Sequence, residues 1–138
     1  MQAIRHDDHP PEAWRPGVTT RMQVSGVTGA RHLCVFEQWI EPGAGAPTHR
    51  HPVEEILTVL DGVADLWLGT THLRLERGQS VVVPEGESHG FTNAGTGMLH
   101  MSAILASPVF EAFFDDGQAV RRWNAPAADT QDQSKRIT

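Results

Sequence analysis

The amino-acid sequence predicts an all-β fold, a sandwich or barrel of many short strands. Short apolar segments recur along most of the chain, and turn residues such as Gly, Pro, Asn and Asp separate them. Asp61-Gly62 stands between two apolar runs, which is a strong indication of a β-hairpin. The 138 residues, of which 39% are hydrophobic, suit a single domain with a small core.

The elements follow one another in a simple order. An N-terminal arm, residues 1–17, is rich in Pro, His and Asp and shows no periodicity. The barrel covers residues 18–116, and its strands are expected at residues 19–25, 31–40, 54–60, 63–68, 72–76, 81–83, 88–92 and 98–105. Three phenylalanines, Phe110, Phe113 and Phe114, have helical spacing, which predicts a short helix over residues 108–115. Residues 117–138 are expected to form a polar tail.

Charge and composition argue against several classes of protein. The formal net charge of −6 disfavours nonspecific binding to nucleic acid or to an anionic membrane. No apolar run approaches the roughly 20 residues of a membrane span, and the first residues are too polar for a signal peptide. Cys34 is the only cysteine, so a disulfide within the chain is impossible and a cytoplasmic location is expected. Arg121 and Arg122 are expected to be solvated charges of the tail.

Four residues together offer the ligands of a metal ion: His49, His51, Glu55 and His89. If the segment from His49 to Glu55 is read as one extended strand, its side chains alternate between faces, and all three of its ligands share a face. On a helix, His49 and His51 would lie about 200° apart, so only an extended conformation directs both toward one ion. Three imidazoles and one carboxylate are a complete set for a divalent transition metal, provided that the fold brings His89 to the others.

The two segments that carry these residues resemble the two signature motifs of the cupin superfamily. The positions that match are Gly43, His49, His51, Glu55 and Gly62 in the first motif, and Gly78, Pro84, Gly86, His89 and Asn93 in the second. The resemblance implies a double-stranded β-helix, or jelly-roll, barrel in a small single-domain cupin that binds one metal ion through its three histidines and Glu55. It also implies a structural role for Asn93 in its turn.

Open coordination positions favour an enzyme. Fe(II) or Mn(II) is the favoured ion, and Ni(II), Co(II) and Zn(II) also suit a mixed imidazole and carboxylate site. Four ligands leave one or two positions of an octahedral ion free for water or substrate. The expected function is a metal-dependent enzyme acting on a small organic substrate, an oxygenase of dioxygenase type or a lyase, with Glu55 as catalytic residue as well as ligand. The alternatives are a cupin that binds or senses a small molecule without turnover, and an isomerase.

The substrate pocket is expected to be lined by residues on the strands that carry the ligands and on two others: Gln38, Val53, Leu57, Phe91 and His100. Alternation directs Gln38 into the cavity if Trp39 lies outside, and the opposite parity is open. His100 faces either the pocket or the exterior.

A homodimer is the expected assembly, because a short barrel exposes sheet edges that need cover. The arm at residues 1–17 and the aromatic segment 110–114 are available to cover them. A small-molecule substrate or ligand is the other expected partner, and neither nucleic acid nor a membrane is expected.

Overall fold

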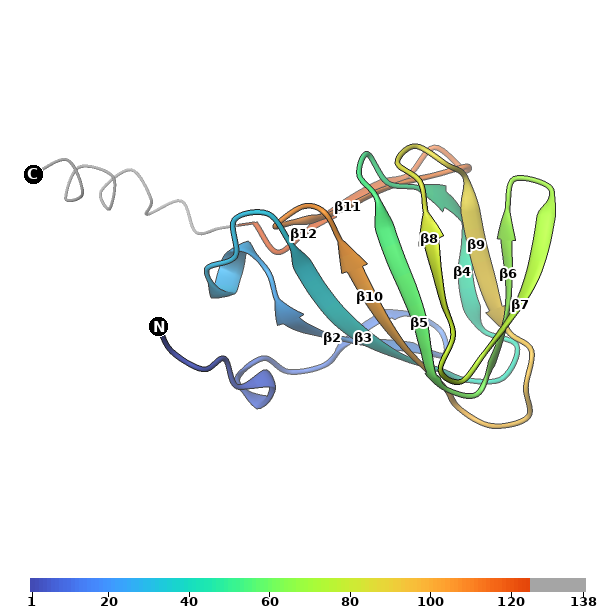
Figure 1. Cartoon of the computed structure of the whole chain (residues 1–138), viewed down its shortest axis with the longest axis horizontal. Helices are drawn as coiled ribbons and strands as arrows, with labels where there is room; N and C mark the ends of the chain where they lie inside the picture. Colours follow the sequence, from blue (N-terminus) through green and yellow to red (C-terminus); the bar gives the residue numbers. More distant parts are fainter. Residues whose placement is uncertain (125–138) are drawn as a thin grey trace, which may run out of the picture.

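Two antiparallel sheets of six strands each face one another in the computed structural model, which describes residues 1–124 (Figure 1). Sheet A has the order β1 (Glu12–Arg15), β2 (Val18–Val24), β3 (Cys34–Ile40), β10 (Leu99–Leu105), β5 (Glu55–Asp61) and β8 (Ser80–Val83). Sheet B has the order β12 (Ala119–Arg122), β11 (Phe110–Phe114), β4 (Gly45–Arg50), β9 (His89–Asn93), β6 (Val63–Leu68) and β7 (Thr71–Glu76). The chain crosses repeatedly between the two sheets, which is the arrangement of a jelly roll.

The predicted all-β fold is confirmed. The eight strands expected between residues 19 and 105 are present, with ends that differ by a few residues, whereas β1, β4, β11 and β12 were not recognised as separate strands. Helical structure in residues 1–124 consists of two 3-10 turns, His6–Asp8 and Gly26–Thr28. None of the helices in this part of the chain has the length and apolar character needed to cross a bilayer.

The hairpin expected at Asp61-Gly62 is wrong, although the turn is present. β5 pairs with β8 and β10 in sheet A, while β6 pairs with β7 and β9 in sheet B. Gly62 has a φ of 94°, a left-handed conformation that favours glycine, and it carries the chain around a corner from one sheet to the other. The Asp61-Gly62 signal therefore predicts where the chain turns, but it does not predict which strands pair with β5 and β6.

Alternation of buried and exposed side chains places the core between the sheets. In β3, Phe36 and Gln38 are buried, while Trp39 lies on the outer face. Met101 of the neighbouring strand β10 is the register partner of Gln38 and is also buried. The inward orientation expected for Gln38 is therefore confirmed.

The helix expected over residues 108–115 is wrong, because this segment contains strand β11. Phe110 and Ala112 are buried and Phe113 is partly exposed, which is the alternation of a strand. β11 pairs with β12 on one side and with β4 on the other, where Phe114 is the register partner of His49. Three phenylalanines at this spacing fit a helix or a strand with two apolar faces, and the long-range pairing decides between them.

Strands also form near both ends of the described chain. β1 lies within the segment expected to be an arm and pairs with β2, and β12 lies within the segment expected to be a tail and pairs with β11. Trp14 of β1 packs against Phe110 of β11, with ring centroids 4.6 Å apart, and Trp123 contacts both rings. These contacts join an edge of sheet A to an edge of sheet B. The rest of the expected tail, residues 125–138, lies outside the described residues.

Candidate metal centre

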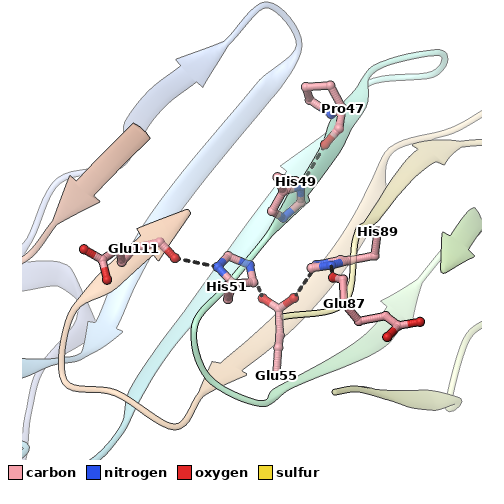
Figure 2. Close-up of polar contacts among 7 residues, drawn as sticks. All are labelled: Pro47, His49, His51, Glu55, Glu87, His89 and Glu111. Atoms are coloured by element: carbon pink, nitrogen blue, oxygen red, sulfur yellow. Dashed lines mark hydrogen bonds and ion pairs between the residues drawn. The ribbon is translucent and has the colours of Figure 1, made fainter. Parts of the chain in front are cut away.

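The fold brings the four expected ligands to one point between the sheets (Figure 2). His49 lies near the end of β4 and His89 begins β9, and the two are direct register partners in sheet B. Glu55 begins β5 and reaches the cluster from sheet A. His51 lies in the connection between β4 and β5, where the chain crosses from one sheet to the other. The site therefore depends on both sheets.

The single extended strand expected from His49 to Glu55 is wrong. β4 ends at Arg50, and β5 begins at Glu55 in the opposite sheet. Pro52 has no amide hydrogen to donate, which is consistent with the end of strand pairing between them. The three side chains converge because the chain wraps around the site.

The ligand atoms form a compact and buried group. One donor atom from each of the four residues lies within 4.8 Å of every other, and all four residues are buried. Glu55 Oε1 lies 3.0 Å from His89 Nε2, and Glu55 Oε2 lies 3.4 Å from His51 Nε2 (Figure 2). The carboxylate is thus shared between two imidazoles. Distances of this size leave room for one ion in contact with all four donors.

Hydrogen bonds to backbone carbonyls orient all three imidazoles in the same way. Nδ1 of His49 lies 2.7 Å from Pro47 O, Nδ1 of His51 lies 2.7 Å from Glu111 O, and Nδ1 of His89 lies 2.9 Å from Glu87 O (Figure 2). A carbonyl oxygen only accepts, so each Nδ1 carries a hydrogen and donates it. In the neutral ring the Nε2 lone pair is then free and directed at the cluster. A metal-binding histidine typically has this arrangement, with one ring nitrogen donating to a carbonyl and the other facing the ion.

Two features of the polar contacts fit a bound cation. Nε2 of His51 is buried and has no hydrogen-bond partner among the described residues. Nε2 of neutral His89 and the ionised Glu55 oxygen are both acceptors, and at 3.0 Å they repel each other unless a proton or a cation compensates. A divalent ion would satisfy both features at once, and the donor set of three imidazoles and one carboxylate suits a transition metal.

The electrostatics of the cluster favour the coordinating forms of His49 and Glu55 and act in the opposite direction on His51. Burial, and then the neighbouring His89 and His51, lower the pKa of His49 to about 3, so this imidazole is neutral at ordinary pH. Burial opposes ionisation of Glu55, but its close contacts with His51 and His89 outweigh that effect and lower its pKa to about 2. Burial likewise disfavours charge on His51, yet its contact with Glu55 raises the pKa of His51 above the ordinary value. Glu55 therefore favours a positive charge at this point, whether a proton on His51 or a bound cation.

A small cavity of about 20 Å³ adjoins the four ligands. This volume holds about one water molecule. Three of the expected pocket residues, Gln38, Leu57 and Phe91, line it. Gln38 Nε2 donates a hydrogen bond to Thr20 Oγ1 at 3.0 Å, which holds the amide in place beside the cavity.

Two expected pocket residues do not reach the cavity. Val53 lies in the connection before β5 and packs against the core as a partly buried side chain. His100 lies on the outer face of β10, where its ring stacks on Trp39 with centroids 4.9 Å apart, and its Nε2 lies 3.4 Å from Glu37 Oε2. The pocket assignment of both residues was wrong, since the turn before β5 and the parity of β10 are set by long-range pairing.

Residues of two strands that were not expected at the site also line the cavity: Trp14, Arg15, Phe110 and Phe114. The first two belong to β1, and the others to β11. A Trp-Arg pair in an otherwise polar arm was the available signal, but four residues are too few to show strand periodicity. Arg122, expected to be solvated, lies over the Trp14 ring at 4.4 Å and forms an ion pair of 3.5 Å with Glu12.

The remaining motif and neighbouring residues have structural roles. Asn93 Nδ2 donates hydrogen bonds to Ile40 O at 2.9 Å and to Gly97 O at 2.8 Å, and its Oδ1 accepts one from Gly95 N at 2.9 Å. Asn93 therefore shapes the turn after β9, in agreement with the role that the motif implies. Cys34 is fully buried, burial raises its pKa to about 12, and its thiol is not part of the group of ligand atoms that converge at the site.

Comparison with known proteins identifies the family. Residues 36–105 match the family described as Cupin domain, and this segment contains all four ligands and both predicted motifs from Gly43 to Asn93. This chain belongs to the cupin family. As in other cupins, the buried His49, His51, Glu55 and His89 of this cupin could hold a metal ion.

Individual relatives of this cupin are distant. Auxin-binding protein 1 of Arabidopsis thaliana is 28% identical over 110 residues, which cover 72% of this chain and 55% of that protein. The chain thus spans about half the length of this relative. The polyketide cyclase RemF of Streptomyces resistomycificus is similar in structure with a TM-score of 0.67 and 22% identity, over 95% of this chain and 93% of RemF. Oxalate decarboxylase of Lactobacillus farciminis has a TM-score of 0.71 and 18% identity, over 80% of this chain and 34% of that chain. At these identities the two structures show the fold alone.

Proposed function

We propose that this cupin is a mononuclear metal-dependent enzyme that oxygenates a small organic substrate. The observation that supports it is the composition of the cavity wall beside the four ligands. The titratable residues that line this cavity are the four ligands themselves and Arg15. An arginine stays protonated and is a poor proton carrier, so among the described residues the cavity wall offers no side chain beyond the four ligands that could accept a proton.

The cavity wall favours chemistry that takes place on the ion. Fe(II) or Mn(II) bound by the three imidazoles and Glu55 would supply Lewis-acid and redox chemistry to a substrate that coordinates through oxygen. Oxygenation requires the fewest proton transfers by the protein, and for this reason we prefer it to elimination or isomerisation.

The residues of the chain have separate parts in this proposal. The backbone carbonyls of Pro47, Glu111 and Glu87 hold the three rings so that each Nε2 faces the ion. Glu55 contributes the one negative charge of the ligand set and is ionised throughout the ordinary pH range. The aromatic rings of the wall lower the local dielectric, which strengthens the attraction between the ion and an anionic oxygen of the substrate.

A lyase is the second candidate, and the observation that favours it is the ionised Glu55 facing the cavity. If Glu55 leaves the ion during turnover, it could accept a proton from carbon or oxygen of the substrate. A third candidate is a cupin that binds its ligand without turnover. The similarity to a protein named for binding auxin favours this candidate, and it requires no change to the site.

Metal substitution separates the three candidates. The metal-free protein is loaded with Fe(II), Mn(II), Ni(II), Co(II) or Zn(II) and given a panel of catechols, enediols, diketones, flavonols and hydroxy acids. Oxygen uptake and products are measured together, with the His89→Ala variant as a control for free metal. The proposal expects oxygen uptake in the Fe(II) or Mn(II) form and none in the redox-inert Zn(II) form. Turnover without oxygen uptake, in the Zn(II) form too, would establish the lyase. Saturable binding with no product in any form would establish the binding protein.

A further inference from the structure

Arg15 lies at the cavity beside the four ligands, and no carboxylate among residues 1–124 forms an ion pair with it. It ends strand β1, is partly buried, and lines both the cavity at the ligands and a second, outer cavity of about 260 Å³. Three aromatic residues also line both cavities: Trp14, Phe110 and Phe114. A molecule in the outer cavity would therefore contact Arg15 next to the aromatic wall of the metal centre.

The other arginines of residues 1–124 are paired with a carboxylate or exposed to solvent. Ion pairs form at Arg5, Arg21, Arg74, Arg121 and Arg122. The side chains without such a pair, apart from Arg15, are exposed: Arg31, Arg50 and Arg77. Within the described part of the chain, Arg15 is thus the partly buried guanidinium that forms no ion pair, although Asp116 also lines the outer cavity.

The contacts that Arg15 does make leave its hydrogen-bonding capacity largely unused. Nη1 donates one long hydrogen bond of 3.4 Å to Gly45 O, and the guanidinium lies 5.6 Å from the centre of the Phe114 ring. Burial, and then the charge of Arg122, lower the pKa of Arg15, which shows that both its surroundings and its neighbour disfavour the positive charge. Arg122 does not share this situation, because Glu12 lies 3.5 Å from it. An anion at Arg15 would remove the cost of an uncompensated charge.

We propose that Arg15 binds a carboxylate group of the substrate, and that the substrate is a small aromatic carboxylic acid whose other oxygens face the metal centre. This inference rests on the proposed function, since it supplies the substrate class for the same site. A guanidinium matches a carboxylate with two parallel hydrogen bonds, and the shared aromatic rings match the flat face of an aromatic acid. The inner cavity has room for about one water molecule. The ring and carboxylate of the acid would therefore occupy the outer cavity, and its other oxygens would pass the aromatic residues to reach the metal centre.

A pair of probes that differ by one carboxylate tests the proposal. The Co(II)-loaded protein is titrated with 3,4-dihydroxybenzoate and with catechol, and the visible absorption of Co(II) reports whether each probe reaches the ion. Wild type is expected to bind 3,4-dihydroxybenzoate at least about 10-fold more tightly than catechol, as one charge-assisted contact provides. Arg15→Gln is expected to lose this preference, while its affinity for catechol stays within about 2-fold of the wild-type value. The Co(II) absorption spectrum of the variant without a probe is expected to match that of wild type. Arg15→Lys, which keeps the charge without the planar fork, is expected to retain part of the preference.

Arg121→Gln is the matched control, because Arg121 is an exposed arginine on the neighbouring strand β12. Its preference between the two probes is expected to equal that of wild type. Equal affinities of wild type for both probes, or an unchanged preference in Arg15→Gln, would overturn the role of Arg15 and leave the proposed function standing. A Co(II) spectrum that responds to neither probe would also overturn the inference about Arg15, and the proposed function would then be decided by oxygen uptake with the wider substrate panel.

Discussion

His49 and His89 are register partners on the neighbouring strands β4 and β9, and their imidazole rings lie 4.3 Å apart, centroid to centroid. Strand pairing in sheet B therefore sets the distance between two of the four ligands. Glu55 completes the cluster from sheet A, so an ion bound by all four residues would connect the two sheets directly. Stability and metal binding should for this reason be coupled.

Metal removal is expected to lower the melting temperature. An ion that binds the folded state alone, at a concentration 100 times its Kd, adds about 2.7 kcal/mol to the free energy of unfolding. Melts of Mn(II)- or Zn(II)-loaded protein are compared with melts in excess chelator, for wild type and for His51→Ala. Chelator should have almost no effect on the variant. Identical melts of fully loaded and fully metal-free wild type would show that the site does not support the fold.

Acid is expected to destabilise the metal-free protein below about pH 6.5. The pKa of His49 is about 3 in the folded state, against an ordinary value of 6.5. Between these two values the unfolded state binds more protons than the folded state, so the free energy of unfolding decreases as the pH is lowered. Glu55, whose pKa is lowered from 4.5 to about 2, adds a loss in the same direction as pH falls through that lower range. The raised pKa of His51 acts above 6.5, where its contribution to stability is lost as pH rises.

Melting temperatures in chelator at pH 6.5 and pH 4.5 check this expectation, with His49→Gln as the matched variant. Wild type should melt at a lower temperature at pH 4.5, and the variant should show a smaller difference between the two conditions. A wild-type protein that is equally stable at both values would contradict the burial of a neutral His49.

Substitution of Glu55 by Gln is expected to reduce activity more than metal content. Glutamine keeps an oxygen donor of the same size but loses the negative charge that two imidazoles share, and it cannot accept a proton. We expect metal affinity to fall about 10- to 100-fold. Activity is measured at saturating metal, so that the loss per bound ion is separated from the loss of the ion. Full activity per bound ion in Glu55→Gln would reduce Glu55 to a replaceable ligand, whereas His89→Ala should lose metal and activity together.

The ligand set and most of the barrel strands could be predicted from the sequence, because both depend on local patterns. The motif positions carry His49, His51, Glu55 and His89, and alternation within one strand places Gln38 inward. The path of the chain between them could not be predicted. Asp61-Gly62 indicates a turn, but whether the next strand pairs with the previous one depends on contacts distant in sequence.

The wall of the cavity was harder to predict for the same reason. Trp14 and Arg15 lie in a strand of four residues whose position is set by β2, and Phe110 and Phe114 lie in a strand whose register is set by β4 and β12. Periodicity over so few residues does not distinguish strand from helix or inside from outside. The site residues that belong to sequence motifs can therefore be recognised from the sequence, whereas the residues that long-range strand pairing places at the cavity cannot.

A homodimer is still expected, but the reason for it has changed. The two segments expected to cover exposed edges supply strands β1, residues 12–15 of the arm, and β11, which pair with β2, β4 and β12 of their own chain. The opposite edges, β7 and β8, expose Leu73 and Val82, which are 42% and 55% accessible. Light scattering at micromolar concentration should give twice the chain mass of 15.1 kDa. Val82→Lys should shift the mass toward the monomer, and a wild-type monomer would contradict the expectation.

Metal stoichiometry in wild type and His51→Ala tests the central claim most directly. Each protein is incubated with Mn(II) or Zn(II), freed of unbound ion, and analysed for metal and protein, with His72→Ala as a control on a histidine whose side chain is 64% exposed. We expect close to one ion per chain in wild type and in His72→Ala, and less than about a tenth of that in His51→Ala, where one ligand is lost. Metal content near one ion per chain in all three proteins would contradict the assignment of the site.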